Sequence, residues 1–160
     1  MVKHSFIYVL KGIFKLIDSI FFSKKKDIVF HGYQGIPSGN NLALYNHIKL
    51  NKSLSCDLFW TGDTNGFAGI DQLFAQPTPS RDQTLYVHLR YLFFLMRFKV
   101  IIVESAGDLG FYMRFLSNGS RLKVLLLHGF CLKGCGILAP NLDNNQIKIW
   151  SQVGTSFNIF

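Results

Sequence analysis

The sequence predicts an α/β fold: a Rossmann-like parallel sheet with flanking helices, preceded by an amphipathic helix. Two observations carry this prediction. Short apolar runs rich in β-forming residues alternate with helical patterns about every 30 residues, which is typical of βαβ units. Two of these runs, residues 100–103 and 124–127, are continuously apolar, as in strands buried on both faces of a parallel sheet. The 160 residues are enough for one domain with its own core.

The first half of the chain is expected to contain a long helix and one βα unit. Apolar residues fill most of residues 4–22, and the polar ones recur every three or four positions, which predicts an amphipathic helix. Asp27–His31 is a short apolar run and predicts a strand. The glycine- and proline-bearing loop that follows predicts a turn before a helix over residues 41–50. Cys56–Trp60 predicts the second strand.

The second half continues the alternation. Residues 61–82 are rich in Gly, Asp, Asn and Pro and predict a long connection. Apolar residues then share one face over Thr84–Arg97, which predicts a helix, and Lys99–Glu104 predicts the third strand. A helix over residues 107–117 is expected to stop at Asn118-Gly-Ser, before a fourth strand over Lys123–Leu127. Residues 146–150 are a candidate fifth strand.

The N-terminal helix has two interpretations. Its polar residues form one narrow stripe, made of Lys11, Lys15, Asp18 and Ser19. The rest of the helix surface is a broad apolar face. Three charges argue against a membrane span, which needs about 20 apolar residues with few charges. The helix is therefore expected either to lie in the membrane interface, with Lys24, Lys25 and Lys26 adding attraction to anionic lipid, or to pack against its own protein.

The net charge and the cysteine content limit the classes of partner and ligand that we expect for this protein. The formal net charge of +8 favours nucleic acid, an anionic membrane surface or a phosphate-bearing ligand. No basic helix with spaced arginines and no zinc-finger spacing is present in the sequence, so we expect no nucleic-acid partner. The three cysteines form neither a disulfide framework nor a metal-ligand set, and neither a metal nor a cofactor is expected.

The strongest candidate for chemistry is His128. It directly follows an apolar strand pattern and precedes Gly129, and a strand that ends in a polar side chain is where ligands bind in α/β proteins. Histidine can act as a general base near neutral pH without large tuning of its pKa. Lys133 and the backbone around Gly134 are candidates for holding phosphate oxygens, because phosphoryl transfer depends on positioning and charge stabilisation.

Four stretches give the sequence a family resemblance: the basic apolar N-terminal helix leading into Ile28-Val-Phe, Ser38-Gly-Asn40-Asn-Leu-Ala-Leu-Tyr45, Phe98-Lys-Val-Ile-Ile-Val-Glu104, and Leu126-Leu-His128-Gly129 followed by Leu132-Lys133. The last resembles the Trp-His-Gly-Thr-Pro-Leu-Lys motif of the CDP-glycerol glycerophosphotransferases, the teichoic-acid primases and polymerases of bacterial cell walls. The second is similar to that family's Ser-Asp-Asn-Pro-x-Ala-x-Tyr. Several motif positions differ, including Leu127 where the family has Trp.

The resemblance covers about residues 5–160 and implies a function. It implies a membrane-surface segment over residues 1–26 and, over residues 27–160, the acceptor-side half of a glycosyltransferase-B architecture. It implies transfer of glycerol phosphate from CDP-glycerol to a lipid-linked acceptor at the cytoplasmic face of the membrane, with Ser38 and Asn40 beside the substrate. The donor-binding half is not in this sequence, so the chain is expected to be incomplete.

Two alternatives stay open. One is a non-catalytic module that binds the acceptor or a partner, or an inactive gene fragment. The other is a nucleotide-binding Rossmann enzyme, for which Gly32–Gly39 is the candidate loop. That loop lacks the Gly-x-Gly-x-x-Gly fingerprint of dinucleotide-binding proteins, and an ordinary βα connection explains it as well.

Overall fold

The fold is a parallel α/β sheet with helices on both faces, as the sequence predicts. The computed structural model describes residues 2–21, 25–51, 55–64, 75–80, 82–104, 106–117 and 121–126. In chain order the elements are α1 (Val2–Phe21), β1 (Lys25–His31), the 3₁₀ turn η1 (Tyr33–Gly35), α2 (Gly39–Leu50), β2 (Leu58–Thr61), β3 (Ala75–Gln76), α3 (Leu85–Met96), β4 (Phe98–Val103), α4 (Ala106–Met113) and β5 (Leu122–Leu125).

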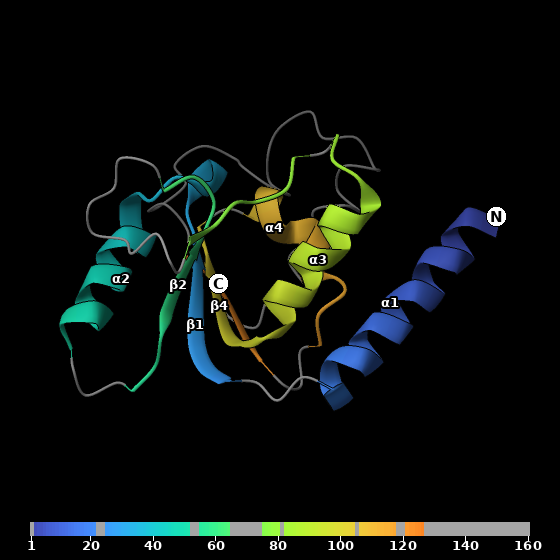
Figure 1. Ribbon diagram of the computed structural model, residues 1–160, viewed down its shortest axis with the longest axis horizontal. Coiled ribbons are helices and arrows are strands. Elements are labelled where there is room, and N and C mark those ends of the chain that lie inside the picture. The colour runs from blue at the N-terminus through green and yellow to red at the C-terminus, as the bar shows by residue number, and fades with distance from the viewer. Residues whose placement is uncertain are drawn as a thin grey trace, which may run out of the picture.

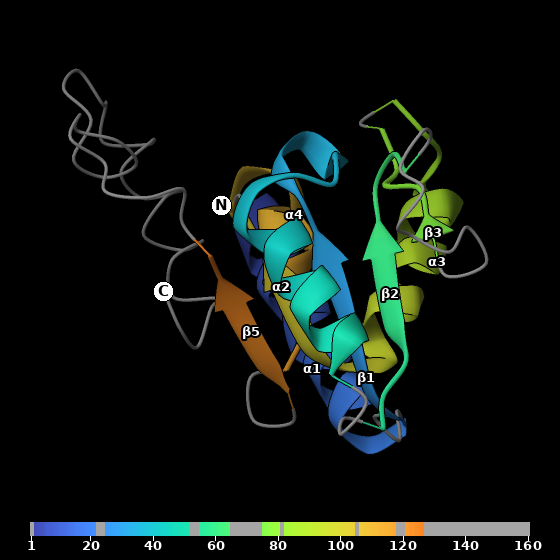
Figure 2. The ribbon, with the colours of Figure 1, turned by 90° about the vertical axis from the view of Figure 1, so that its left-hand side faces the viewer.

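The strand order identifies a doubly wound sheet. All four strand pairings are parallel, and the order is β3-β2-β1-β4-β5, with β3 and β5 at the two sides of the sheet in Figure 2. The chain moves from β1 to β2 and β3, then crosses back to β4 on the other side of β1. Right-handed crossovers in opposite directions place helices on opposite faces. Accordingly α2 covers one face, and α3 and α4 cover the other (Figure 1).

Each face of the sheet has its own apolar core. The face under α3 and α4 buries Ile101 and Val103 against Leu95, Met96 and Leu109 of the two helices. The face under α2 has a smaller aromatic core. The rings of Phe30 and Trp60 stack with their centroids 5.9 Å apart, and the ring of Tyr45 on α2 contacts both of them edge-on. The prediction of a strand buried on both faces is therefore confirmed for β4, and β1 is buried on both faces as well.

Helix α1 packs on the outside of α3 and α4, at the far right in Figure 1. The ring of Phe14 contacts those of Phe93 on α3 and Phe115 just after α4, at 6.2 and 5.8 Å. Asp18 is fully buried and forms an ion pair with Arg121, the residue before β5. The polar stripe predicted on α1 therefore faces the protein at Asp18, because this carboxylate pairs with a cation from a distant part of the chain.

The docked helix nevertheless leaves apolar side chains in solvent. Val9, Ile13, Leu16 and Ile20 follow one outer stripe at spacings of four, three and four, and Tyr8 lies next to Val9. Each of the five side chains is 47–63% exposed. Packing on its own protein and an apolar outer face thus occur together in α1. No helix in the described ranges is both long and apolar enough to cross a bilayer.

Several predicted boundaries were wrong. β1 begins at Lys25 rather than Asp27, because Lys25 already pairs with Phe98, ahead of an irregularity in the register. Two of the three lysines of the run, Lys25 and Lys26, therefore belong to the sheet. β3 lies inside the expected connection 61–82. Helix α4 ends at Met113, four residues early, where the chain turns. The candidate strand over residues 146–150 lies outside the described residues.

Buried Lys123 explains where α4 ends. Its ammonium donates hydrogen bonds to the carbonyl oxygens of Met113 and Leu116, at 3.0 and 2.9 Å, at the negative end of the helix. Burial, together with the nearby charges of Arg121 and Lys15, lowers the pKa of Lys123 to about 7. The folded protein therefore releases this proton at a much lower pH than the unfolded chain, whose lysines titrate near pH 10.

This shift predicts a pH dependence of stability. Between about pH 7 and 10 the unfolded chain binds one more proton at this position, so the contribution of Lys123 to the free energy of unfolding rises with pH, by up to about 1.4 kcal/mol per pH unit. We expect Lys123→Met to flatten the wild-type slope by that amount in urea unfolding at pH 7, 8 and 9. Lys99→Met, at an exposed lysine of β4, is the matched control. Equal slopes for the wild type and Lys123→Met would contradict the assignment.

Candidate functional site

The candidate site lies at the carboxyl edge of the sheet, where β1 and β4 end side by side. These two strands continue into helices on opposite faces, which makes their boundary the topological switch point of the sheet. In open α/β sheets ligands bind outside the carboxyl ends of the strands at this point. The residues there are His31 and Gly32 at the end of β1, Glu104 at the end of β4, and the first turn of α2.

His31 joins the ends of β1 and β2. Its side chain is buried, and its Nδ1 lies 3.0 Å from the carbonyl oxygen of Thr61. A carbonyl oxygen only accepts hydrogen bonds, so Nδ1 is assigned as the protonated nitrogen. The backbone oxygen of His31 accepts hydrogen bonds from the amide of Glu104, at 3.1 Å, and from the side-chain amide of Asn41, at 2.6 Å. His31 therefore anchors three elements of the edge.

Glu104 ties β4 to the start of α2. Its side chain is buried, and Oε1 accepts a hydrogen bond of 2.9 Å from the backbone amide of Asn40. A carboxylate at a helix N-terminus is stabilised by the unpaired amides and the helix dipole. The positive end of α2 thus interacts with an acidic side chain of the protein itself.

Ser38 and Asn40, the two predicted phosphate-binding residues of this loop, both lie at the carboxyl edge. Ser38 precedes the first residue of α2 and makes no side-chain capping bond; its Oγ lies 3.4 Å from the carbonyl oxygen of Ile36. Asn40 is exposed, but its amide already donates to Glu104. A phosphate at this amide would have to displace the carboxylate of Glu104. Phosphate binding by Ser38 and Asn40 therefore stays a prediction.

The loops after β1 and β2 are in backbone contact. Gly62, after β2, has a φ of +127°, and a Cβ placed on it would lie 2.0 Å from the carbonyl oxygen of Gly35. Gly35 has a φ of +79°, and the indole of Trp60 donates to its carbonyl oxygen at 3.5 Å. Glycine at position 62 is therefore required by both conformation and space, and the two loops form one unit beside His31.

The residues with the strongest chemical prediction lie beyond the part of the chain that the structure describes. These are His128, Gly129, Lys133 and Gly134; Lys24 is also outside the described ranges. The structure does describe the strand that leads to them. β5 ends at Leu125, and the amide of Leu126 still donates to the carbonyl oxygen of Val103, at 2.8 Å. Two residues before His128, the chain is therefore at the carboxyl edge beside β4.

Sequence reasoning missed His31 and Glu104 as members of the site. Each is a polar residue at the end of an apolar strand, which is the same signal that singled out His128. Strand order decides which strand ends meet, and the order could not be read from the residues. His88 of α3 lies half-buried, with its Nδ1 2.7 Å from the hydroxyl of Tyr112.

Possible metal ligands and the one cysteine within the described ranges complete the description of the site. No three side chains among His, Cys, Asp and Glu in those ranges could together hold a metal ion. Cys56 is a free thiol there, and burial raises its pKa, with Asp27 and Asp57 adding to the effect. A raised pKa lowers the thiolate fraction, so Cys56 is not an activated nucleophile.

Comparison of the chain with protein-family models, with curated proteins and with solved structures finds no significant match. What is established is therefore the doubly wound α/β fold and the geometry of its carboxyl edge.

Proposed function

We propose that this chain is the acceptor-side part of a membrane-associated CDP-glycerol glycerophosphotransferase-like protein. It transfers glycerol phosphate, or a related polyol phosphate, to a lipid-linked cell-wall or surface-polymer acceptor at the cytoplasmic face of the membrane. The observation that carries the proposal is the end of β5. This strand ends at the carboxyl edge beside β4, and the sequence continues at once into Leu127-His128-Gly129. A histidine that follows such a strand can reach a substrate held at the edge.

The proposed reaction requires one proton transfer. The acceptor hydroxyl oxygen forms a bond to the phosphorus of the glycerol phosphate group, and the bond from this phosphorus to the oxygen of CMP breaks. His128 takes the hydroxyl proton, and CMP leaves as the phosphate anion. Lys133 and the amides near Gly134 neutralise charge on the transferring phosphoryl group. A second domain that binds the CDP-linked donor completes the site, as the resemblance implies.

Membrane association is proposed through α1. Five apolar side chains of α1 remain exposed after the helix has docked: Tyr8, Val9, Ile13, Leu16 and Ile20. Lys15 is exposed on the same helix. Burial of these side chains in the acyl boundary, with lysines near anionic head groups, supplies the two weak signals that stable peripheral binding requires. Lys24, Lys25 and Lys26 are the other basic residues proposed to face the lipid. Lys11, also predicted to do so, lies seven residues before the buried Asp18, on the docked side of α1 and near the charge of Arg114.

The outer stripe gives a direct prediction. Removing two half-exposed aliphatic side chains is expected to cost about 1 kcal/mol of membrane binding each. We therefore expect Ile13→Ser/Leu16→Ser to lower partitioning onto phosphatidylglycerol vesicles about thirtyfold in flotation assays. The matched control is Ile36→Ser/Leu50→Ser, at exposed residues on the α2 side of the molecule. If the two double variants float equally well, α1 is not the membrane-binding element.

Release of CMP tests the catalytic part. The full chain is incubated with CDP-glycerol, vesicles carrying a lipid-linked acceptor and the product of the adjacent reading frame. We expect CMP to be released only when both proteins are present. Absence of release from every combination, with both proteins folded, would overturn the enzymatic proposal and leave the non-catalytic binding module as the interpretation.

A further inference from the structure

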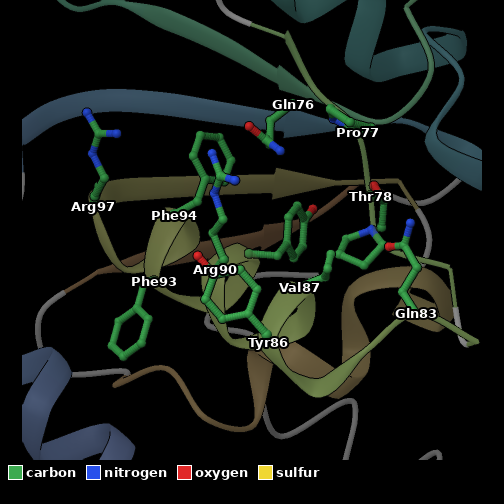
Figure 3. Close-up of a pocket in the computed structure, with 12 residues that line it drawn as sticks. Gln76, Pro77, Thr78, Gln83, Tyr86, Val87, Arg90, Phe93, Phe94 and Arg97 are labelled. Carbon is green, nitrogen blue, oxygen red and sulfur yellow. The ribbon is translucent and has the colours of Figure 1, made fainter.

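A basic, aromatic groove runs along α3, on the opposite face of the sheet from α2. It encloses a volume of about 500 Å³ between α3 and the segment that follows β3. Figure 3 shows the residues that line it. The end of β3 and the segment after it contribute Gln76, Pro77, Thr78 and Pro79. Helix α3 and the residues next to its two ends contribute Gln83, Tyr86, Val87, Arg90, Tyr91, Phe93, Phe94 and Arg97.

The groove is cationic. Arg90 and Arg97 are exposed and seven residues apart, so they lie on the same side of α3, two turns or about 10 Å from each other. Their side chains extend in the same direction in Figure 3. None of the described residues that line the groove is acidic. Two guanidinium groups without an acidic neighbour in the lining favour an anionic ligand, and a guanidinium matches the oxygens of a phosphate group bidentately.

The groove is also aromatic. Tyr86 is 71% exposed and Phe93 40%, while Phe94 is half-buried beside Arg90 in the close-up (Figure 3). Aromatic side chains of this size are normally buried, and several of them exposed together mark a binding surface. A small inorganic anion would use the arginines and leave these rings in water. A ligand with a charged end and an apolar body uses both.

Phe93 connects the groove to the proposed membrane-binding helix. Its ring lies 6.2 Å from that of Phe14, whose helix carries the apolar outer stripe. In Figure 3 Phe93 points toward this helix, which is drawn in blue at the lower left. Helix α1 and the groove therefore lie next to each other in the same helical layer.

We propose that the α3 groove binds the phosphate-bearing head group of an anionic lipid, with Arg90 and Arg97 on the phosphate oxygens and Tyr86, Phe93 and Phe94 against the apolar part. The proposal deepens the proposed function and rests on its membrane part, because it names where the lipid phosphate of a membrane-held ligand is recognised. It assigns the groove a binding role, while the chemistry stays at the carboxyl edge.

Short-chain lipids below their micelle concentration test the groove without a membrane. The full chain is titrated with dihexanoyl phosphatidylglycerol, dihexanoyl phosphatidylcholine or inorganic phosphate, and binding is followed by calorimetry and by tyrosine fluorescence. We expect the anionic lipid to bind at least tenfold more tightly than either other ligand. Arg90→Gln and Arg97→Gln should each weaken it tenfold or more, since each removes a charged hydrogen-bond donor to the phosphate oxygens. Lys49→Gln on α2 removes the same charge elsewhere and should leave the affinity unchanged.

Each other outcome overturns the proposal. Equal affinity for inorganic phosphate and the anionic lipid would show that the groove recognises free phosphate. Unchanged affinity in both arginine variants, with far-UV circular dichroism showing that they are folded, would place the lipid elsewhere. The Ile13→Ser/Leu16→Ser variant separates the two proposals: loss of vesicle flotation with normal binding of the short-chain lipid locates the functions on different surfaces. The titration needs no catalysis, so a failure to observe CMP release would not change the result expected from it.

Discussion

Asp18→Ala is expected to destabilise the protein by about 3–5 kcal/mol, because it leaves a buried cation without its counter-charge. Asp18 Oδ1 accepts from the guanidinium of Arg121, and Oδ2 accepts from the amide of Ser117 at 2.7 Å. The guanidinium also donates to the carbonyl oxygens of Leu95 and Met96, at 2.9 and 3.1 Å, at the end of α3. Burial lowers the pKa of Arg121 to about 10, and Asp18 opposes this shift.

Two controls make the experiment on Asp18 specific. Ser19→Ala changes the exposed neighbour, and it should stay within about 0.5 kcal/mol of the wild type. Asp18→Ala/Arg121→Met removes both charges, and it should be more stable than Asp18→Ala alone, because a buried pair can be replaced by apolar side chains at little cost. The free energies come from urea unfolding followed by circular dichroism. A loss below 1 kcal/mol in Asp18→Ala would show that the ion pair does not hold α1.

His128→Ala is expected to lower the rate of CMP release about 10²–10⁴-fold in the combined assay, which is the usual effect of removing a general base. The reason is that the acceptor hydroxyl is a poor nucleophile until its proton is removed. The wild-type rate should also fall as histidine becomes protonated below about pH 6.5, and the variant should lose this dependence. His47→Ala, at an exposed histidine in the last turn of α2, is the matched control.

The pH profile distinguishes a base from a binding residue. If His128 only positioned the acceptor, its removal would raise KM and leave the pH dependence of the residual rate in place. If the rate of the variant equals that of the wild type, the proton is taken by another group. Since the variant changes a residue outside the described ranges, its folding is checked by the same urea unfolding as for Asp18→Ala.

The main elements of the fold could be predicted because each has a strong local pattern. The continuous apolar runs of β4 and β5 and the periodicity of α3 are readable from a dozen residues at a time. β3 could not be predicted, since it has two residues and exists through its pairing with Trp60 and Thr61 of β2. The start of β1 was missed for a related reason: the pairing of Lys25 with Phe98 is a property of the sheet.

The site was less predictable than the fold, because its contacts are distant in sequence. Local pattern placed Asp18 on a polar stripe, but its partner Arg121 is 103 positions away. Likewise the amide of Asn40 meets Glu104 across 64 positions. Strand ends can be recognised one at a time, whereas the meeting of His31 with Glu104 depends on β1 and β4 being neighbours. The order of the strands is thus the information that the sequence alone did not provide.

The ion pair between Asp18 and Arg121 also sets an order of events during synthesis. Helix α1 leaves the ribosome before the residue that holds its buried carboxylate, and the 103 intervening positions take roughly 5–20 s to translate at about 5–20 residues per second. During that interval α1 has apolar side chains on both of its faces, and its docked state lacks the ion pair with Arg121. If α1 binds a bilayer as proposed, the nascent helix has time to reach lipid before the ion pair fastens it to its domain.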